Sequence, residues 1–291
     1  MKTLIGSGVA LITPFNEDNS IDFTSLGKLI EHQITGGIDY LVSLGTTGET
    51  ATLNKKEKQE ILRFTAEKVN GRIPLVVGIG GNNTQEIIVQ LRELDLSDYS
   101  AILSVSPYYN KPTQEGLFQH YKALAEESPL PIILYNVPGR TGSNIEAKTS
   151  VRLANTFPNI IGIKEASGNF HQYSEIMRDK PKDFLLISGD DALLLPMVAL
   201  GASGVISVLA NALPTQVSTL TKLCLEHNFN DAGKLHNQLL KITDLCFIEG
   251  NPAGVKSILH QYNICKESIR LPLTPVSENT RNRIIEELKN F

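Results

Sequence analysis

The sequence has 291 residues, of which 41% are hydrophobic and 20% are charged, and its formal net charge is −4. Acidic and basic residues are mixed along the chain, so no basic stripe favours a nucleic acid or a membrane surface as partner. No apolar run approaches the ~20 residues of a membrane span. The three cysteines form no CxxC pair, which is typical of reduced thiols in a cytoplasm and disfavours a disulfide frame.

The first residues, MKTLIGSGVALITPF, run from a short apolar stretch directly into Pro14 and a polar turn. They lack the small-residue cleavage site of a secretory signal, so we expect a first strand there. Seven further short apolar runs, bounded by Gly, Pro, Asn or Thr, favour strands over helices. The eight expected strands are residues 9–13, 40–44, 74–79, 101–105, 132–136, 160–164, 184–188 and 204–208.

Segments with the apolar spacing of helices separate these strands. Residues 22–37 begin with a candidate Asp22 cap, Asn54 and Glu57 form a capping box, and residues 113–128 are amphipathic. Strand and helix alternate eight times within residues 1–225, which predicts a parallel sheet closed into an α/β (β/α)₈ TIM barrel. An open doubly wound sheet is the alternative, and the absence of GxGxxG after the early strands disfavours it.

Beyond residue 225 the strand signal stops. Three helices are expected, at residues 231–248, 253–263 and 277–290. We therefore divide the chain into a catalytic barrel over residues 1–225 and a C-terminal helical region over residues 226–291. The apolar stripes of these helices must cover the barrel or another subunit.

Glycines and small polar residues cluster at the C-terminal ends of the expected strands. In a (β/α)₈ barrel, reactive groups gather at those ends, and glycine lets the backbone approach a small ligand. This concentration indicates an enzyme that acts on a small molecule. The motifs are GTTGE (45–49), SPYYN (106–110), YNVPGRTG (135–142), KEASGN (164–169) and SGDD (188–191).

Lys164 is the unusual residue of the stretch IIGIKEASGN (160–169). Side chains alternate across a strand, so Lys164 would share the barrel interior with Gly162 and Ile160. Ile161 and Ile163 would then pack against the outer helices, and Gly162 would leave room below the lysine.

An inward lysine is partly desolvated, which lowers its pKa and makes its neutral amine available for Schiff-base chemistry. The same alternation turns Tyr135 into the barrel mouth. The residues alone leave two other interpretations of Lys164 open, namely an ion pair with Glu165 and a solvated strand tip.

Other residues acquire roles if this lysine reacts with a 2-oxo acid. The hydroxyls and amides of Thr46 and Thr47 can hold the substrate carboxylate, and Arg140 can clamp a second carboxylate with its planar guanidinium. Tyrosine hydroxyls linked by a threonine hydroxyl can relay protons without placing a carboxylate beside the iminium.

No metal site and no cofactor are expected. The six histidines form no HxH or HExxH pattern. Asp190 and Asp191 could ligate a cation, but acidic residues at this place more often cap a helix N-terminus.

Seven motifs, in this order and at these spacings, resemble the dihydrodipicolinate synthase family of pyruvate-dependent class I aldolases, a superfamily that also includes N-acetylneuraminate lyase. They are VALITPF, GTTGE, SPYYN, LYNVPGRTG, GIKEASGN, SGDD and GVISV, and the resemblance covers essentially the whole chain. It implies condensation of pyruvate with L-aspartate 4-semialdehyde through a lysine Schiff base. The product would be 4-hydroxy-tetrahydrodipicolinate, the first committed intermediate of diaminopimelate and lysine biosynthesis.

Carried over by motif, the resemblance implies that Lys164 forms the Schiff base and that Tyr135 donates and accepts the proton over it. Thr46 would link Tyr135 to Tyr109, which in the family comes from the neighbouring subunit. The family's helical tail and tight-dimer face imply a homotetramer.

The resemblance also implies the residues that hold the substrates. Thr47 and the backbone at Ile206 would hold the pyruvate carboxylate. Arg140 would receive L-aspartate 4-semialdehyde, with the Gly189 backbone nearby.

Two other functions remain as alternatives. One is a related aldolase, such as a sialic acid or keto-deoxy sugar-acid lyase, which Arg140 and the Thr46-Thr47 pair disfavour. The other is a non-catalytic ligand sensor on the same scaffold, which would be expected to have lost Lys164, Tyr135 or Thr46.

Family members that lysine inhibits carry an effector pocket at the tight-dimer interface. Asn82, Glu86 and Tyr108 match that pocket, whereas Lys55 and Lys58 stand where such members commonly have histidines. Two cationic side chains weaken the binding of a cationic effector. We therefore expect feedback inhibition by L-lysine to be weak or absent.

Overall fold

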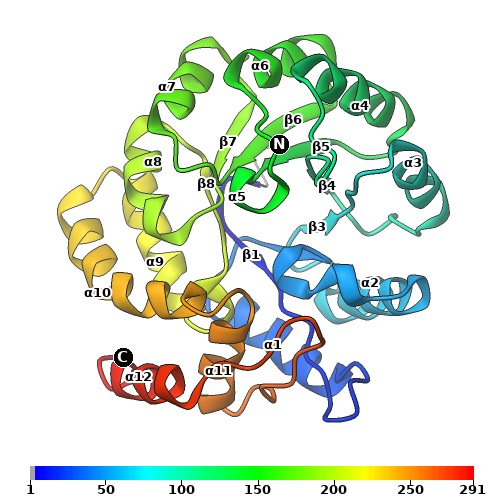
Figure 1. Ribbon diagram of the computed structural model, residues 1–291. Coiled ribbons are helices and arrows are strands. Elements are labelled where there is room, and N and C mark those ends of the chain that lie inside the picture. The colour runs from blue at the N-terminus through cyan, green and yellow to red at the C-terminus, as the bar shows by residue number, and fades with distance from the viewer. Residues whose placement is uncertain (1–3) are drawn as a thin grey trace.

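The eight short apolar runs of the sequence form eight parallel strands that close into one barrel in chain order (Figure 1). The computed structural model describes residues 4–291, and residues 1–3, at the start of the expected barrel region, lie outside the described part. The strands are β1 (Gly6–Ala10), β2 (Tyr40–Ser43), β3 (Leu75–Gly78), β4 (Ala101–Val105), β5 (Ile132–Asn136), β6 (Ile160–Glu165), β7 (Leu185–Ser188) and β8 (Gly204–Ser207).

Seven of these strands begin and end within one residue of the expected bounds, so the strand predictions are confirmed there. The first was expected at residues 9–13 and is wrong by three residues. Beyond Leu11 the chain leaves the sheet, because Ile12 N donates to the Asn211 side chain at 3.1 Å and Thr13 Oγ1 donates to Gly48 O at 2.7 Å. The glycine-rich start of β1 resembles a turn in sequence, which explains the error.

The barrel closes where β8 pairs with β1 in parallel register, from Gly6 opposite Gly204 to Val9 opposite Ser207. Gly204 has φ +137°, and a Cβ at this position would lie 1.9 Å from Gly6 O. Only glycine allows the two strands to meet here. Closure excludes the open doubly wound sheet.

Helices surround the sheet in the alternation that the sequence predicts (Figure 1). Asp22 caps the first one by accepting from Ser25 N at 2.9 Å, and Asn54 and Glu57 form the expected capping box. These helices are α1 (Phe23–Thr35), α2 (Lys55–Val69), α3 (Thr84–Glu93), α4 (Gln114–Glu127), α6 (Ala147–Thr156), α7 (Phe170–Asp179), α8 (Leu194–Leu200) and α9 (Pro214–Leu225), with the short α5 (Pro138–Thr141) directly after β5.

Apolar side chains form one layer inside the barrel and a second between the sheet and the helices. Ile161 lies in the inner layer and Ile160 in the outer one, so the predicted orientation of these two residues is wrong. The register between β5 and β6 jumps from Ile132 opposite Ile160 to Ile133 opposite Gly162. Such a bulge shifts the alternation of side chains by one residue.

The structure also explains why residue 162 is glycine, and the explanation differs from the one expected. A Cβ there would lie 2.8 Å from Leu185 O and 2.9 Å from Leu185 Cβ. The glycine therefore admits the backbone of β7 and does not serve to make space for Lys164. After the bulge Ile163 faces the helices and Lys164 faces the barrel cavity, as predicted.

Three helices follow α9, within two residues of the expected bounds: α10 (Phe229–Phe247), α11 (Ala253–Gln261) and α12 (Glu278–Leu288). Helix α10 packs against α9, and α11 contacts the barrel end at the short turn η5 (Leu209–Asn211). Whether residues 226–291 form a region separate from the barrel stays a prediction. Within residues 4–291, no helix is both long enough and apolar enough to cross a membrane.

Candidate active site

A cavity of about 200 Å³ opens at the C-terminal end of the barrel. The ends of β5 and β6 and the loops after β2 and β7 supply much of its lining, as expected for a barrel of this type. Six of the predicted site residues line it together: Thr46, Thr47, Tyr135, Arg140, Lys164 and Gly189.

Lys164 lies in this cavity with only 5% of its surface exposed. Its Nζ is 4.4 Å from the centroid of the Tyr135 ring, on the neighbouring strand. The low exposure excludes a solvated strand tip. Lys164 therefore presents its amine to a cavity, where an amine can attack the carbonyl carbon of a substrate to form a Schiff base.

Glu165 does not pair with Lys164, because its carboxylate lies on the opposite side of the strand. Its Oε1 accepts from Asn136 Nδ2 at 2.7 Å and from Gln172 Nε2 at 2.6 Å, and its Oε2 accepts from Ser167 N at 3.2 Å. Burial raises the pKa of this fully buried carboxyl group, against the effect of those hydrogen bonds. The sequence alternative of a Lys164–Glu165 ion pair is therefore wrong.

The Glu165 carboxylate connects the residues that follow Lys164 and Tyr135, the two strand side chains that face the cavity. Asn136 follows Tyr135, and Asn136 Oδ1 accepts from Ile145 N at 2.9 Å. Since Glu165 follows Lys164, one buried hydrogen-bond network fixes the ends of β5 and β6. The sequence analysis did not identify this network, although a glutamate and an asparagine directly after two inward residues were a usable signal.

Thr46 and Thr47 open a short 3₁₀ turn, η2 (Thr46–Gly48), at the cavity. The first amides of such a turn have no partner within it, so they can donate to an anion. Asn251 Nδ2 donates to Thr47 Oγ1 at 2.9 Å. Asn251, which also lines the cavity, was missed in the sequence because it lies in the loop after α10.

Arg140 lies on α5 at the mouth of the same cavity, and its side chain is exposed. Gly189 also lines the cavity, and its amide donates to Glu165 O at 2.7 Å. A Cβ on Gly189 would lie 3.0 Å from Lys164 Cε and 2.8 Å from Ala166 Cβ. Glycine at this position thus leaves space for the lysine side chain.

Two predicted residues do not reach the cavity in a single chain. Tyr109 is 85% exposed and is not part of the lining. Ile206 is buried inside the barrel, two residues before Val208, which does line the cavity. The roles expected for Tyr109 and for the Ile206 backbone stay predictions.

The two aspartates of SGDD act within the fold. Asp190 caps the turn η4 (Asp191–Leu193) by accepting from Ala192 N at 2.9 Å, which confirms the cap prediction. Asp191 accepts from Val208 N at 2.9 Å and from the Ser207 hydroxyl, and burial raises the pKa of its carboxyl group. Among residues 4–291, no group of three or more His, Cys, Asp or Glu side chains could hold a metal ion.

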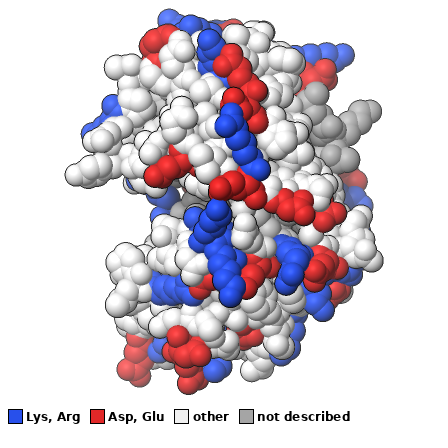
Figure 2. Space-filling model, turned by 90° about the vertical axis from the view of Figure 1, so that its right-hand side faces the viewer, with Lys and Arg blue, Asp and Glu red and all other residues white. Residues whose placement is uncertain are grey.

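The predicted effector residues lie on the side of the molecule that carries α2 and α3. Lys55, Lys58 and Glu86 line a groove of about 510 Å³ there, and Asn82 Nδ2 donates to Tyr108 O at 3.4 Å. Figure 2 shows this side, on which basic and acidic side chains alternate.

Two lysines and two glutamates line that groove, namely Lys55, Lys58, Glu86 and Glu93. Lys55 Nζ pairs with Glu93 at 2.7 Å. Lys58 is half-buried, and burial lowers the pKa of its ammonium group. No ion pair to Lys58 is found within residues 4–291.

Comparison with known proteins gives one consistent result. The model of the dihydrodipicolinate synthetase family matches residues 3–291. The 4-hydroxy-tetrahydrodipicolinate synthase of Flavobacterium psychrophilum is 50% identical over 284 residues, which is 98% of this chain and 97% of that protein.

Two solved structures show the same fold at 41% identity and a TM-score of 0.95. One is dihydrodipicolinate synthase from Aquifex aeolicus, with 98% of this chain and 97% of that chain covered. The other is the chloride-inhibited dihydrodipicolinate synthase from Acinetobacter baumannii in complex with pyruvate, with 99% and 98% covered.

Proposed function

The chain belongs to the dihydrodipicolinate synthetase family, and from this premise we propose that it condenses pyruvate with L-aspartate 4-semialdehyde to give 4-hydroxy-tetrahydrodipicolinate. This places it as a lyase of the class I aldolase type in diaminopimelate and lysine biosynthesis. The observation that carries the proposal is the buried Lys164 amine, which lies 4.4 Å from the Tyr135 ring and away from Glu165.

The chemistry starts from the Lys164 amine in the cavity. Lys164 Nζ attacks the keto carbon of pyruvate, and loss of water leaves an imine. Removal of a methyl proton gives the enamine, whose carbon forms a bond to the aldehyde carbon of the second substrate while the aldehyde oxygen takes up a proton. The substrate's amino group then attacks the imine carbon, which closes the ring and releases Lys164.

The cavity residues divide these tasks. Tyr135 moves the proton at the reacting carbon and nitrogen, and Thr46 links its hydroxyl to that of Tyr109. The turn amides and hydroxyl of Thr47, with the backbone at Ile206, hold the pyruvate carboxylate. Arg140 receives the carboxylate of the semialdehyde at the mouth.

A homotetramer, assembled as a dimer of dimers in the cytoplasm, is part of this proposal. Tyr109 is 85% exposed and needs a neighbouring subunit to reach a cavity. A further hollow of about 410 Å³ adjoins the first and shares Thr46, Tyr135 and Arg140 with it. This hollow gives space for a tyrosine from the partner.

A sialic acid or keto-deoxy sugar-acid lyase is the less favoured function. It would use the same lysine chemistry, but Arg140 at the mouth suits a second carboxylate better than a sugar hydroxyl. A ligand sensor is disfavoured because Lys164, Tyr135 and Thr46 all line the cavity.

The test is pyruvate consumption by the purified protein with L-aspartate 4-semialdehyde, compared with N-acetylmannosamine and with glyceraldehyde. We expect rapid turnover with the semialdehyde alone and background turnover in Lys164→Ala. Borohydride should trap pyruvate on the wild type and not on the variant, as measured by mass spectrometry. Turnover with a sugar aldehyde would overturn the assignment of Arg140, and absence of turnover and trapping would favour the sensor.

A further inference from the structure

Lys256 of α11 is a lysine that the proposed reaction does not use, although it is completely buried. Its Nζ lies 2.5 Å from Glu49 Oε1 and donates to Ser268 O at 2.8 Å. Both side chains of the pair are shielded from solvent, with 0% and 1% exposed. Burial lowers the pKa of Lys256, and Glu49 opposes that shift.

Glu49 belongs to the loop that forms the proposed pyruvate site. It connects η2, which carries Thr46 and Thr47, to the turn η3 (Thr50–Thr52). Its φ of +53° lies in the left-handed region, which costs free energy for a residue other than glycine. The backbone of Glu49 keeps this conformation only if its surroundings hold it there.

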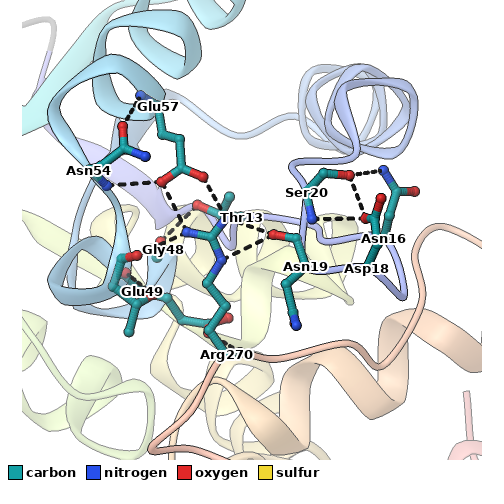
Figure 3. Close-up of polar contacts among 11 residues, drawn as sticks. Thr13, Asn16, Asp18, Asn19, Ser20, Gly48, Glu49, Asn54, Glu57 and Arg270 are labelled. Atoms are coloured by element: carbon teal, nitrogen blue, oxygen red, sulfur yellow. Dashed lines mark hydrogen bonds and ion pairs between the residues drawn. The ribbon is translucent and has the colours of Figure 1, made fainter.

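A second cation of the C-terminal region, Arg270, also contacts Glu49 and the residues that follow it. Arg270 N donates to Glu49 Oε2 at 3.0 Å, and the Arg270 guanidinium donates to Thr52 O at 2.9 Å and pairs with Glu57 at 2.5 Å. Figure 3 shows the guanidinium between Glu57 and the Asn19 carbonyl, with Glu49 next to the Arg270 backbone.

The aromatic ring of Phe15 lies against both cations. The Lys256 Nζ is 4.4 Å and the Arg270 Cζ 4.3 Å from the ring centroid. From the other side of the loop, Thr13 Oγ1 donates to Gly48 O at 2.7 Å. The loop of residues 45–52 is thus held by β1 and its extension on one side and by the C-terminal region on the other.

A buried ion pair adds little stability compared with apolar residues of equal volume, because desolvation offsets the attraction. Such a pair can instead specify one arrangement of the chain. Here Glu49, one member of the pair, belongs to the loop that carries Thr46 and Thr47. Asn251, in the same C-terminal region, donates directly to Thr47 Oγ1.

We propose that Lys256, acting through Glu49, is a positioning residue that holds the Thr46–Thr47 turn in the geometry that receives the pyruvate carboxylate. This inference rests on the proposed function of the site. The C-terminal helices then complete the substrate site in addition to covering the barrel.

The experiment compares Lys256→Met, Glu49→Gln and the double variant with the wild type. We expect each single variant to lower Tm and to raise the KM for pyruvate by about tenfold or more, with a smaller change in kcat, because misplacement by ~1 Å can cost up to 100-fold. The double variant, which leaves no buried charge unpaired, should recover most of Tm but keep the raised KM. Recovery of both together, or a fall in Tm with KM unchanged, would overturn the proposal.

Two further variants accompany this experiment: a surface control and a variant that removes another contact of the same loop. Lys234→Met removes an exposed ion pair with Asp231 and should change neither KM nor Tm. Thr13→Val removes the hydroxyl that donates to Gly48 O without altering any charge, and should raise the pyruvate KM severalfold.

If Lys256→Met does not fold, Glu49→Gln decides, because it removes the same ion pair from the other side, and an unchanged pyruvate KM in that variant would overturn the proposal. Borohydride trapping of pyruvate on the wild type separates the two proposals. Without trapping, the function itself fails. If trapping occurs, the KM and Tm measurements test only the positioning role of Lys256.

Discussion

The two buried lysines among residues 4–291, Lys164 and Lys256, lie in different surroundings. Lys256 lies 2.5 Å from the Glu49 carboxylate, so its ammonium is balanced. Lys164 is nearly as buried but faces an aromatic ring in a cavity, and the carboxylate next to it in sequence points elsewhere. Lys256 is thus held by a counter-ion inside the fold, whereas Lys164 presents its amine to a cavity that can admit a substrate.

Gly189→Ala should remove much of the activity although it adds only one methyl group. The new Cβ would lie 3.0 Å from Lys164 Cε and 2.8 Å from Ala166 Cβ, so the lysine has to move or the loop has to shift. Overpacking of this kind costs about 1–3 kcal/mol of stability, and the trapped pyruvate adduct should form more slowly. The measurement is the rate of borohydride trapping together with Tm.

Gly233→Ala is the matched control for that change. An added Cβ at Gly233, in α10, meets nothing within 4 Å, and alanine is favoured over glycine in a helix by about 1 kcal/mol. This variant should keep full activity and a Tm at or above that of the wild type. Equal trapping rates in both variants would show that Gly189 does not shape the lysine site.

At the scale of elements, the buried Glu165 carboxylate fixes the ends of β5 and β6 from the side of the sheet that faces away from the cavity. The bulge turns Lys164 inward, and Glu165 then bonds Asn136 and Gln172 on the far side of the strand. Two adjacent side chains on opposite faces of a strand therefore serve different purposes. Lys164 faces the cavity, and Glu165 holds the strand that carries it.

Glu165→Gln should change the pH dependence of stability. Burial raises the folded-state pKa of this carboxyl group above its ordinary value of 4.5. Its contribution is then fully present below about pH 4.5 and is lost as the pH rises through the raised pKa, because the charged form has to be buried. Glutamine carries no charge, so the Tm of the variant should rise relative to that of the wild type as the pH increases from 4.5.

A series of Tm measurements across pH checks this, with the exposed Glu226→Gln as the control for loss of a carboxylate. A difference between wild type and Glu165→Gln that stays constant with pH would contradict the prediction.

The groove between α2 and α3 predicts weak feedback inhibition by L-lysine. Lys58 lines it and is half-buried, while Lys55 is partly balanced by Glu93. Glu86 and Glu93 balance the formal charge of the groove, but Lys58 forms no ion pair within residues 4–291 and would repel a cationic effector that binds beside it. Steady-state rates should therefore fall little with added L-lysine, whereas Lys58→His should strengthen inhibition by about tenfold, equivalent to ~1.4 kcal/mol. Potent inhibition of the wild type would refute the prediction.

At the scale of the whole molecule, a single chain holds an incomplete set of the expected site residues. Lys164, Tyr135 and Thr46 meet in one cavity, but Tyr109 is exposed at the surface. A tyrosine that is 85% exposed cannot relay protons in a closed site of its own chain. The proposed tetramer resolves this by placing Tyr109 in the cavity of a neighbour.

Mixing two inactive variants tests that arrangement. Tyr109→Phe should lower kcat by about 10²–10⁴-fold, the usual worth of a positioned proton-transfer group, and Lys164→Ala should be inactive. When the two are unfolded and refolded together, mixed assemblies contain a site with Lys164 from one subunit and Tyr109 from the other. Activity should return in the mixture and in neither variant refolded alone. No recovery would show that Tyr109 acts within its own chain or not at all.

The amino-acid sequence by itself determined the features that depend on neighbours in the chain. Seven strands, the Asp22 cap and the Asn54–Glu57 capping box follow from local patterns of apolar and polar residues, and they hold in the structure. The inward direction of Lys164 and Tyr135 was also predicted correctly from the alternation of side chains across a strand.

Only the tertiary structure decided the features that depend on distant contacts. The bulge that reverses Ile160 and Ile161 arises from pairing with β5 and leaves no mark in the alternation of a single strand. Asn251 meets Thr47 across 204 residues of chain, and Lys256 meets Glu49 across 207. No local pattern reports such pairs, because closure of the barrel and packing of the C-terminal helices bring them together.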